Sequence, residues 1–457
     1  MKMTVRELAA ACGGTLLAGD PEAAVTSAST DSREIEPGAL FVPVAGEKTD
    51  GHAFIAKAFA AGAAATLTQK GRLTRVGGAW IAVDDTRLAL QKIAAAWRKR
   101  FSGPVVGVTG SVGKTTTKEL TALALSAGKR VLRTEGNRNS QVGLPLTVLR
   151  LSPEYDAAVV EMGMSEFGEM ARIAAVAAPD FAVLTNIGLS HIGQLKTREN
   201  ILREKLHIAD RFHEGSALFL NGDDPMLAAL RGKLPFETVY YGTKPWCDFR
   251  ADGLRAEGET AEFRWTAPDG ETGEARLAVP GVHSVLDALA ALAAAQRLGV
   301  PPAKAAAALA KYRPIAMRLQ VRRTEGGVTV IDDSYNSSPD AAKSSLDVLC
   351  GFSGGKRVAV LADMLELGDF SRRAHEEVGR HAARAGVDAL VTVGNEARAV
   401  AGGALAERPS LPCRICRSNA EALAELRRIL AAGDTVLVKG SRGMRTDEIV
   451  AGLLRRG

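Results

Sequence analysis

Apolar residues recur along this chain with the spacing of both helices and strands. Over residues 5–12 they return every three to four positions, which predicts an amphipathic helix. Short apolar runs at 39–44 and 66–68 instead predict strands, and an alanine-rich stretch at 52–64 predicts a helix between them. Residues 1–98 are therefore expected to form a small α/β domain.

A second block, residues 99–312, alternates apolar runs with helical stretches. This alternation predicts a parallel, doubly wound sheet. A polar, strand-like stretch near 245–279 and an alanine-rich helix at 282–297 end the block. The apolar runs that predict its strands lie at residues 104–109, 157–160, 181–185 and 217–220.

The third block, residues 313–457, repeats the alternation and predicts a second nucleotide-fold-like domain. The repeated Ala/Leu helices are interpreted as core-packing elements and not as a repeat array. The predicted fold class is α/β, with a small N-terminal domain, a central parallel-sheet domain and a Rossmann-like C-terminal domain. The strands of the third block are expected at residues 328–332, 357–361, 389–393 and 435–438.

Composition narrows the class of protein. A chain of 457 residues is too long for one core, and 46% hydrophobic with 24% charged residues excludes disordered and fibrous classes. The net charge is 58 − 52 = +6, scattered along the chain, and aromatics are only 5%, which fits small anionic ligands better than nucleic acid. No apolar stretch suits a membrane span or a signal region. We expect a cytoplasmic enzyme with no nucleic-acid partner and no integral membrane segment.

The five cysteines form an odd, sparse set, which argues against a disulfide framework and fits a reducing compartment. Cys413 and Cys416 form one C-x-x-C. A zinc site would normally need a second ligand pair, and a redox motif would usually open a helix. We therefore interpret the pair as two cysteines in a strand.

A glycine-rich turn at residues 107–115 is the strongest chemical signal. It follows a buried strand and precedes a helix expected to begin around Thr115, so that backbone N–H groups and a helix N-terminus converge where a polyphosphate can bind. The strict G-x-x-x-x-G-K-[ST] pattern is not met because position 108 is Val; the chain has G-x-x-G-K-T preceded by Gly107. Lys114 would neutralise the β/γ-phosphates and Thr115 would bind Mg²⁺. A purely structural loop is the alternative.

Three further residues are candidates for the same site. Glu161 directly follows the run at 157–160, where a Mg²⁺ ligand is expected beside a phosphate loop. His191 follows the next strand; a lone loop histidine is more often a surface residue, but its place after a strand of the same sheet favours a function. By composition alone, Lys205 is a solvated helix lysine.

Taken together, the motifs resemble the Mur ligase family, and the resemblance covers nearly the whole chain. The phosphate loop reads T-G-S-V-G-K-T-T, and the segment at 136–147 reads G-N-R-N-S-Q-V-G-L-P-L-T. The third block contains D-D-S-Y-N at 332–336 and K-G-S-R-G-M at 439–444. The segments at 30–33, 40–42 and 50–54 resemble the family's uridine-nucleotide-binding domain.

The resemblance implies an ATP-dependent amide ligase that joins D-alanyl-D-alanine to UDP-N-acetylmuramoyl-tripeptide through an acyl phosphate. We expect a monomer. It implies catalytic roles for Lys114, Lys205, His191 and Arg318. The implied nucleotide-binding residues are Thr109, Gly110, Ser111, Val112, Gly113, Lys114, Thr115, Thr116, Asn137, Ser284, Asp287, Arg318, Asp332, Tyr335 and Asn336. The implied UDP-substrate residues are Ser32, Arg33, Asp50 and His52.

The family also implies two Mg²⁺ ions and a carbamylated lysine fourteen residues after the metal-binding histidine, which here is Lys205 after His191. An ammonium cannot bind Mg²⁺, but addition of CO₂ to the neutral amine gives an anionic carbamate with oxygen ligands. By this resemblance Thr115 and Glu161 would hold one ion. His191 and the carbamate would hold the second.

One segment departs from the family pattern. The usual G-x-H-N-x-x-N reads G-V-H-S-V-L-D at 281–287, so Ser284 and Asp287 replace two asparagines. Both can form hydrogen bonds, but an ionised aspartate cannot donate one. Adenine contacts from this helix are therefore expected to differ from those of relatives.

Three other functions stay open at this stage. A sister ligase that adds the third amino acid would carry a different segment at Tyr335-Asn336. A folate-type polyglutamate ligase would lack the uridine-type N-terminal block. A regulatory P-loop ATPase would explain the loop but not the ordered set of His191, Lys205 and Tyr335-Asn336.

Overall fold

The computed structural model describes residues 1–46, 49–71 and 77–455. The chain divides into two compact units and passes between them five times, including once inside each of β11 (Phe181–Leu184), α8 (Arg198–Leu206) and β12 (Ala217–Asn221). The first unit contains residues 1–109, 128–183 and 204–218, and the second contains residues 110–127, 184–203 and 219–457.

The first unit begins with a five-stranded sheet of order β2-β7-β6-β5-β4, in which only the β2–β7 pair is antiparallel. The predicted helix at 5–12 is confirmed as α1 (Val5–Cys12), which a Thr4–Glu7 capping box begins. The strands are β2 (Thr15–Ala18), β4 (Ser27–Ser29), β5 (Ala39–Phe41), β6 (Ala65–Gln69) and β7 (Ala79–Val83).

The helix predicted at 52–64 is shorter than expected. A 3-10 turn, η1 (Gly51–Phe54), leads into α2 (Ile55–Ala60). The helix ends at Ala60 because the chain turns back, with the amides of Gly62 and Ala63 donating to the carbonyls of Phe59 and Ala58. An alanine-rich composition favours helix but does not locate its end.

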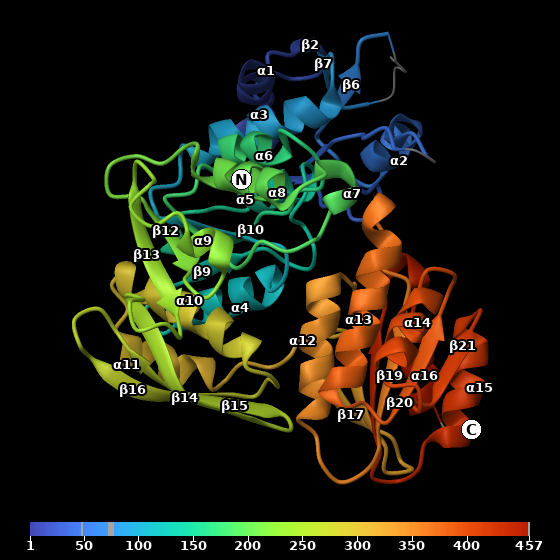
Figure 1. Cartoon of the computed structure of the whole chain (residues 1–457). Helices are drawn as coiled ribbons and strands as arrows, with labels where there is room; N and C mark the ends of the chain where they lie inside the picture. Colours follow the sequence, from blue (N-terminus) through green and yellow to red (C-terminus); the bar gives the residue numbers. More distant parts are fainter. Residues whose placement is uncertain (47–48, 72–76, 456–457) are drawn as a thin grey trace. The chain divides into compact units, whose positions relative to one another are not determined.

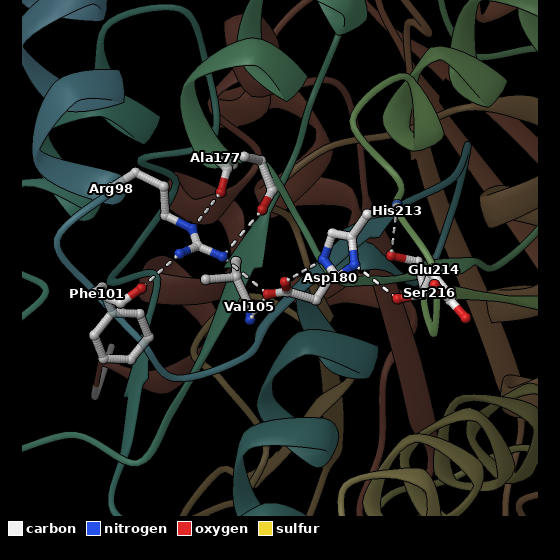
Figure 2. Close-up of polar contacts among 9 residues, drawn as sticks. Arg98, Phe101, Val105, Ala177, Asp180, His213, Glu214 and Ser216 are labelled. Atoms are coloured by element: carbon white, nitrogen blue, oxygen red, sulfur yellow. Dashed lines mark hydrogen bonds and ion pairs between the residues drawn. The ribbon is translucent and has the colours of Figure 1, made fainter.

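Helix α3 (Thr86–Arg98) connects the N-terminal sheet to the central part of the first unit. It packs on α1 and on α5 (Gly143–Val148) and α6 (Glu169–Ala177). At its end the buried Arg98 guanidinium binds a carboxylate oxygen of Asp180 at 2.8 Å, and the same oxygen accepts the Val105 amide at 2.7 Å (Figure 2). The guanidinium also donates to the carbonyls of Ala177, Ala178 and Phe101.

The predicted strands of the central sheet are confirmed. In the first unit β8 (Val105–Thr109), β10 (Ala157–Glu161) and β9 (Val131–Arg133) are parallel in the order β8-β10-β9. Every residue of β8 and β10 is buried, as expected for strands covered on both faces. Thr109 and Glu161 therefore lie at the carboxyl ends of adjacent strands.

The central part of the second unit contains the phosphate-loop helix α4 (Lys114–Leu125), which packs against α10 (His283–Arg297) and α11 (Pro302–Leu309). The polar stretch predicted near 245–279 is confirmed as strands. β14 (Phe249–Glu257), β15 (Thr260–Thr266) and β16 (Thr272–Leu277) pair antiparallel, and β13 (Glu237–Gly242) lies parallel to β14.

The C-terminal block, drawn in orange to red in Figure 1, contains a Rossmann-like sheet. The strand order is β17-β18-β22-β19-β20-β21, and all pairs except β17–β18 are parallel. Alternate strand residues such as Val358 and Val360 pack with α15 (Asn419–Ile429) and α16 (Asp447–Leu454). The strands are β17 (Gln320–Arg323), β18 (Thr329–Asp333), β19 (Arg357–Ala362), β20 (Ala389–Val393), β21 (Cys413–Cys416) and β22 (Thr435–Lys439).

Helices α12 (Pro339–Cys350), α13 (Ser371–Ala385) and α14 (Arg398–Glu407) complete the C-terminal block. The interpretation of the C-x-x-C as part of a strand is confirmed, because Cys413 and Cys416 are the two ends of β21. Within the described ranges, no helix combines the length and apolarity needed to cross a membrane. The remaining elements are β1 (Met3–Thr4), β3 (Ala24–Val25), α7 (Ile192–Leu195), α8 (Arg198–Leu206), η2 (His207–Ala209), α9 (Pro225–Ala228), η3 (Gly368–Phe370) and η4 (Arg442–Met444).

Candidate active site

The phosphate loop, residues 110–113, has the backbone that a polyphosphate site requires. Gly110 and Gly113 take φ values of 152° and 86°, which side-chain-bearing residues rarely adopt. A Cβ on Gly113 would lie 2.7 Å from Oδ1 of Asp287. Helix α4 begins at Lys114, close to the predicted start, so its first-turn amides face the loop.

A second segment, residues 185–190, fixes the shape of this loop. The amides of Ser111 and Val112 donate to the backbone and side-chain oxygens of Asn186, both at 3.0 Å. The Thr185 hydroxyl donates to the Val112 carbonyl at 2.5 Å, and the Gly188 amide donates to the Ser111 hydroxyl at 2.9 Å. The loop is therefore held in place by the chain that leads to His191.

The side chains expected to meet the nucleotide lie at this loop. The Lys114 ammonium donates to the Gly110 carbonyl at 2.8 Å and to the Ser111 carbonyl at 3.3 Å. Thr115 is buried in the first turn of α4, and Thr116 beside it is partly exposed. Thr109 is buried at the end of β8.

The two residues that depart from the family pattern lie on α10. Asp287 accepts a hydrogen bond from the Thr117 hydroxyl at 2.7 Å, and burial raises its pKa to about 7, although that hydrogen bond lowers it. The Ser284 hydroxyl donates to the Pro280 carbonyl at 3.0 Å. Asp287 is thus adjacent to the phosphate loop, whereas the hydroxyl of Ser284 is used within the start of its own helix.

Glu161, in the first unit, has the features of a cation ligand. Its Oε1 accepts the Asn139 side-chain amide at 2.6 Å, and its backbone amide donates to the Thr134 hydroxyl at 2.9 Å. Its Oε2 is buried and has no hydrogen-bond partner among the described residues, which fits a bound cation. No sequence pattern indicated the supporting roles of Asn139 and Thr134. Asn137, predicted to bind nucleotide, is exposed.

Lys205 is almost completely buried, with 1% of its surface exposed, on α8. The interpretation of this residue as a solvated helix lysine is therefore wrong. Its neighbour Glu204 joins α8 to the start of α6 by accepting the amides of Gly168 and Met170 at 3.0 and 2.9 Å. These contacts fix the part of α8 that carries Lys205.

His191 lies in the second unit, just before α7, with a left-handed φ of 63°. Its Nδ1 lies 2.7 Å from a carboxylate oxygen of Glu366, although the two groups are not aligned for a hydrogen bond. The His191 ring nevertheless lowers the pKa of the Glu366 carboxyl. No pattern in the sequence joined these two residues.

The four expected metal ligands are divided between the two units, with Thr115 and His191 in the second and Glu161 and Lys205 in the first. Over the described ranges, no group of three His, Cys, Asp or Glu side chains is arranged to hold a metal. The expected set includes a hydroxyl and a modified lysine, which are outside those four residue types. The metal assignment therefore stays a prediction.

The Arg318 segment, residues 317–319, lies at the start of the C-terminal block. Its guanidinium carbon is 4.2 Å from the ring centre of Tyr335, and the Tyr335 amide donates to the Met317 carbonyl at 3.1 Å. Met317 and Leu319 have φ values of 63° and 49°, which non-glycine residues rarely adopt. Arg318 and Tyr335, both predicted to bind nucleotide, are therefore in contact.

A buried ion pair supports this segment. Asp333 and Lys439 end adjacent parallel strands in register, and the lysine ammonium binds the aspartate carboxylate directly. Asp333 also accepts the Ser345 hydroxyl at 2.7 Å and the Leu319 amide at 3.2 Å. Both residues occur in segments that resemble the family, Asp333 in D-D-S-Y-N and Lys439 in K-G-S-R-G-M, but neither segment indicated that they pair.

Two other residues of the D-D-S-Y-N motif behave differently. Asp332 accepts the Ser334 hydroxyl at 2.5 Å and the Ser334 amide at 3.2 Å, and burial raises its pKa. Asn336 is exposed, and its backbone carbonyl accepts the Lys439 ammonium at 3.0 Å. The motif therefore combines buried support with an exposed amide side chain.

The predicted UDP-substrate residues lie in the N-terminal block. His52 and Asp50 are in contact, with Nδ1 2.7 Å from the carboxylate, while Nε2 of His52 accepts the Gln69 amide at 3.3 Å. Both ring nitrogens thus hold the loop. Arg33 is exposed and forms a double hydrogen bond with Asp31, which lowers the pKa of Asp31 to about 2. Ser32 beside it is buried.

Comparison with known proteins identifies relatives over the full length. Residues 24–98 match the family model for the Mur ligase family catalytic domain, 108–295 the Mur ligase middle domain, and 317–442 the Mur ligase glutamate ligase domain. A Bacillus subtilis protein named UDP-N-acetylmuramoyl-tripeptide--D-alanyl-D-alanine ligase is 36% identical, covering 99% of each chain.

Solved structures also match this chain over nearly its whole length. The crystal structure of MurF from Acinetobacter baumannii matches with a TM-score of 0.91 and 29% identity, covering 100% of this chain and 99% of that one. The structure of MurF ligase from Thermotoga maritima in complex with ADP matches with a TM-score of 0.81 and 30% identity, covering 94% and 97%.

Proposed function

Because the chain belongs to the Mur ligase family, we infer that it joins D-alanyl-D-alanine to UDP-N-acetylmuramoyl-tripeptide in an ATP-dependent reaction. The observation that carries this function is the 36% identity to a ligase of that specificity over 99% of both chains. The glycine-rich loop before α4 supplies the phosphate site that such a reaction needs.

We propose that the reaction passes through an acyl phosphate. A carboxylate oxygen of the UDP-linked peptide attacks the γ-phosphorus of ATP, and the bond to the β-phosphate oxygen breaks to release ADP. The amine of D-alanyl-D-alanine then attacks the activated carbonyl, loses a proton, and phosphate leaves. The carboxylate is a poor electrophile before phosphorylation, so transfer of the phosphoryl group makes amide formation possible in water.

The residues at the loop would act by position and charge. Lys114 already lies over the loop carbonyls, where it would meet the β- and γ-phosphates. The hydrogen bonds between residues 111–112 and Asn186 keep the loop in one shape, which limits the reorganisation needed when phosphate binds.

Mg²⁺ fits the residues that are present. Glu161 offers a buried carboxylate oxygen without a hydrogen-bond partner among the described residues, and Thr115 offers a buried hydroxyl at the start of α4. When bound, the cation neutralises charge on the phosphates. These two residues would hold one ion, and His191 with carbamylated Lys205 would hold a second.

Burial supports the proposed modification of Lys205. A buried ammonium needs a negatively charged partner, whereas addition of CO₂ gives a carbamate whose negative charge can pair with a bound cation. Lys205→Ala should abolish ligation without rescue by bicarbonate, while Lys57→Ala, on α2, should leave it unchanged. Mass spectrometry of the chain without substitutions, kept under CO₂, should detect the added CO₂ on Lys205.

The C-terminal block would supply Arg318 to the γ-phosphate. Its contact with Tyr335 and the network of Asp333 and Lys439 hold the segment that carries it. The N-terminal block, with Ser32, Arg33, Asp50 and His52, would bind the uridine nucleotide. We also propose that the enzyme acts in the cytoplasm as a monomer.

One assay tests the function. The purified chain is incubated with UDP-N-acetylmuramoyl-tripeptide, D-alanyl-D-alanine and Mg-ATP, and the products are identified by mass spectrometry. We expect UDP-linked pentapeptide and ADP in equal amounts, and phosphate release only with both peptide substrates. Phosphate release without either substrate would instead indicate a regulatory ATPase. Trapping with hydroxylamine tests the acyl phosphate.

A further inference from the structure

His191 and Glu366 are in contact, and both have a strained backbone conformation. Both are non-glycine residues in the left-handed region, with φ values of 63° and 65°. Each such residue costs about 1–2 kcal/mol and keeps this conformation only where its surroundings hold it there. In this conformation Nδ1 of His191 lies 2.7 Å from the Glu366 carboxylate.

The contact between these residues is part of a larger attachment within the second unit. The Gly193 amide donates to the Glu366 carbonyl at 3.2 Å, and η3 packs on α7. The Leu189 amide donates to the Asp340 carboxylate at 2.9 Å. Residues 188–193 are therefore bound by two separate parts of the C-terminal block.

The backbone just before Glu366 is held by two hydrogen bonds. The amide of its neighbour Leu365 donates to the Ser441 hydroxyl at 2.9 Å, and the Met364 amide donates to Nε2 of the buried His375 at 3.0 Å. Its carboxylate is 56% exposed, whereas His191 is 24% exposed. A fixed backbone thus presents a solvated carboxylate to one nitrogen of a mostly buried ring.

We propose that Glu366 is a positioning residue for His191, accepting the Nδ1 proton so that Nε2 is directed to the cation. Metal-binding histidines almost always donate their other ring nitrogen to a carboxylate or carbonyl, which fixes the tautomer and the ring orientation. The Nδ1 atom of His191 and the Glu366 carboxylate oxygen, 2.7 Å apart, are within the distance of such a hydrogen bond. The inference rests on the proposed role of His191 as a metal ligand.

It follows that the C-terminal block contributes to the metal site without supplying a ligand. The same chain segment holds the phosphate loop through Gly188 and Ser111 and carries His191. Attachment of Glu366 to this segment would therefore couple the nucleotide loop, the cation and the C-terminal block.

The test uses Glu366→Ala and Glu366→Gln in the full chain, with Mn²⁺ as the probe. Binding of Mn²⁺ in the presence of ADP is measured by electron paramagnetic resonance, and the His191 tautomer by ¹⁵N NMR of the ring. We expect Glu366→Ala to weaken Mn²⁺ binding about tenfold or more and to lose the single tautomer. Glu366→Gln keeps an acceptor oxygen and should restore part of both.

Two further variants separate the possible outcomes. Glu407→Gln removes another exposed carboxylate of the C-terminal block, paired with Arg384, and should change neither measurement. His191→Ala should weaken Mn²⁺ binding. If His191→Ala weakens binding and Glu366→Ala does not, the positioning role is overturned while the metal role stands. If His191→Ala has no effect, both are overturned.

Discussion

The phosphate loop and the Arg318 segment each rest on a buried aspartate, and the two carboxylates are satisfied differently. Asp287, beneath the loop, is in contact with the neutral Thr117 hydroxyl, and burial raises its pKa to about 7. Asp333, beneath the Arg318 segment, binds the Lys439 ammonium as well as a hydroxyl and an amide. The charge of Asp333 is therefore compensated by a cation, whereas Asp287 has a neutral hydroxyl as its partner.

The backbones of the phosphate loop and the Arg318 segment also differ, in the residues that take left-handed conformations. The loop takes its left-handed conformations at Gly110 and Gly113, where they cost little, and the Arg318 segment takes them at Met317 and Leu319. Residues 185–190 hold the glycine loop in a conformation that costs its backbone little. The Arg318 segment instead has this conformation at non-glycine residues, so its geometry depends on the ion pair beneath it.

Lys439→Met should have the largest effect on stability, because it leaves Asp333 buried without its cation. We expect the free energy of opening strands β18 and β22 to fall by about 3–5 kcal/mol. Hydrogen exchange at the amides of these strands measures it. Lys343→Met breaks a longer pair with Glu377 and should cost less than about 1 kcal/mol. Equal losses would show that the ion pair does not hold the segment.

Asp287→Asn should stabilise the protein at high pH, whereas Lys439→Met destabilises it. The folded-state pKa is raised from 3.8 to about 7, so the stability that this group contributes is present below pH 4 and is lost as pH rises through 7. The variant should exceed the parent by at most about 4 kcal/mol at pH 8, with the difference vanishing toward pH 4.

Thermal unfolding between pH 4 and 8 measures this difference. Asp31→Asn is the opposite control, because Arg33 lowers the pKa of Asp31, so this variant should not be more stable at pH 8. A pH-independent difference between Asp287→Asn and the parent would contradict the raised pKa.

Gly113→Ala should weaken binding of Mg-ATP about 100-fold, because the added methyl group would lie 2.7 Å from the Asp287 carboxylate. Isothermal titration calorimetry measures the affinity. Gly215→Ala is a matched control: Gly215 has the same φ of 86° and no atom within 4 Å of an added Cβ. Similar losses of ATP affinity in both variants would attribute the effect to backbone strain and not to the contact with Asp287.

Met317→Gly should have the smallest effect, a gain of at most about 1 kcal/mol, because relief of the left-handed strain exceeds the entropy that glycine adds to the unfolded chain. Hydrogen exchange in β18 again measures it. Arg322→Gly, in the neighbouring strand β17, should destabilise the block. A loss of the same size in both variants would mean that Met317 is not strained.

Much of the fold could be predicted because its signals are local. The run before the phosphate loop, the helix predicted at 282–297 and the strand at Cys413 each correspond to an observed element within a few residues. These elements follow from burial on both faces or from one uninterrupted helical pattern. The length of the helix predicted at 52–64 was overestimated because its end is set by a turn and not by composition.

The site was predictable only in part, because its support comes from residues far apart in the sequence. The loop glycines and Lys114 form one contiguous motif, whereas Glu366 approaches His191 from another block. Burial of Lys205 depends on contacts of α8 that no local pattern encodes. The residue types of the reaction could thus be found in the sequence, but not the residues that position them.

The polar contacts of Arg98 have a practical consequence for dividing this chain into fragments (Figure 2). A fragment that starts at residue 99 would match the expected central domain but would lose the guanidinium that neutralises Asp180. The carbonyls of Ala177, Ala178 and Phe101 would lose their donor at the same time. Such a fragment should express poorly, and one that starts ahead of α3, near residue 84, should keep its solubility.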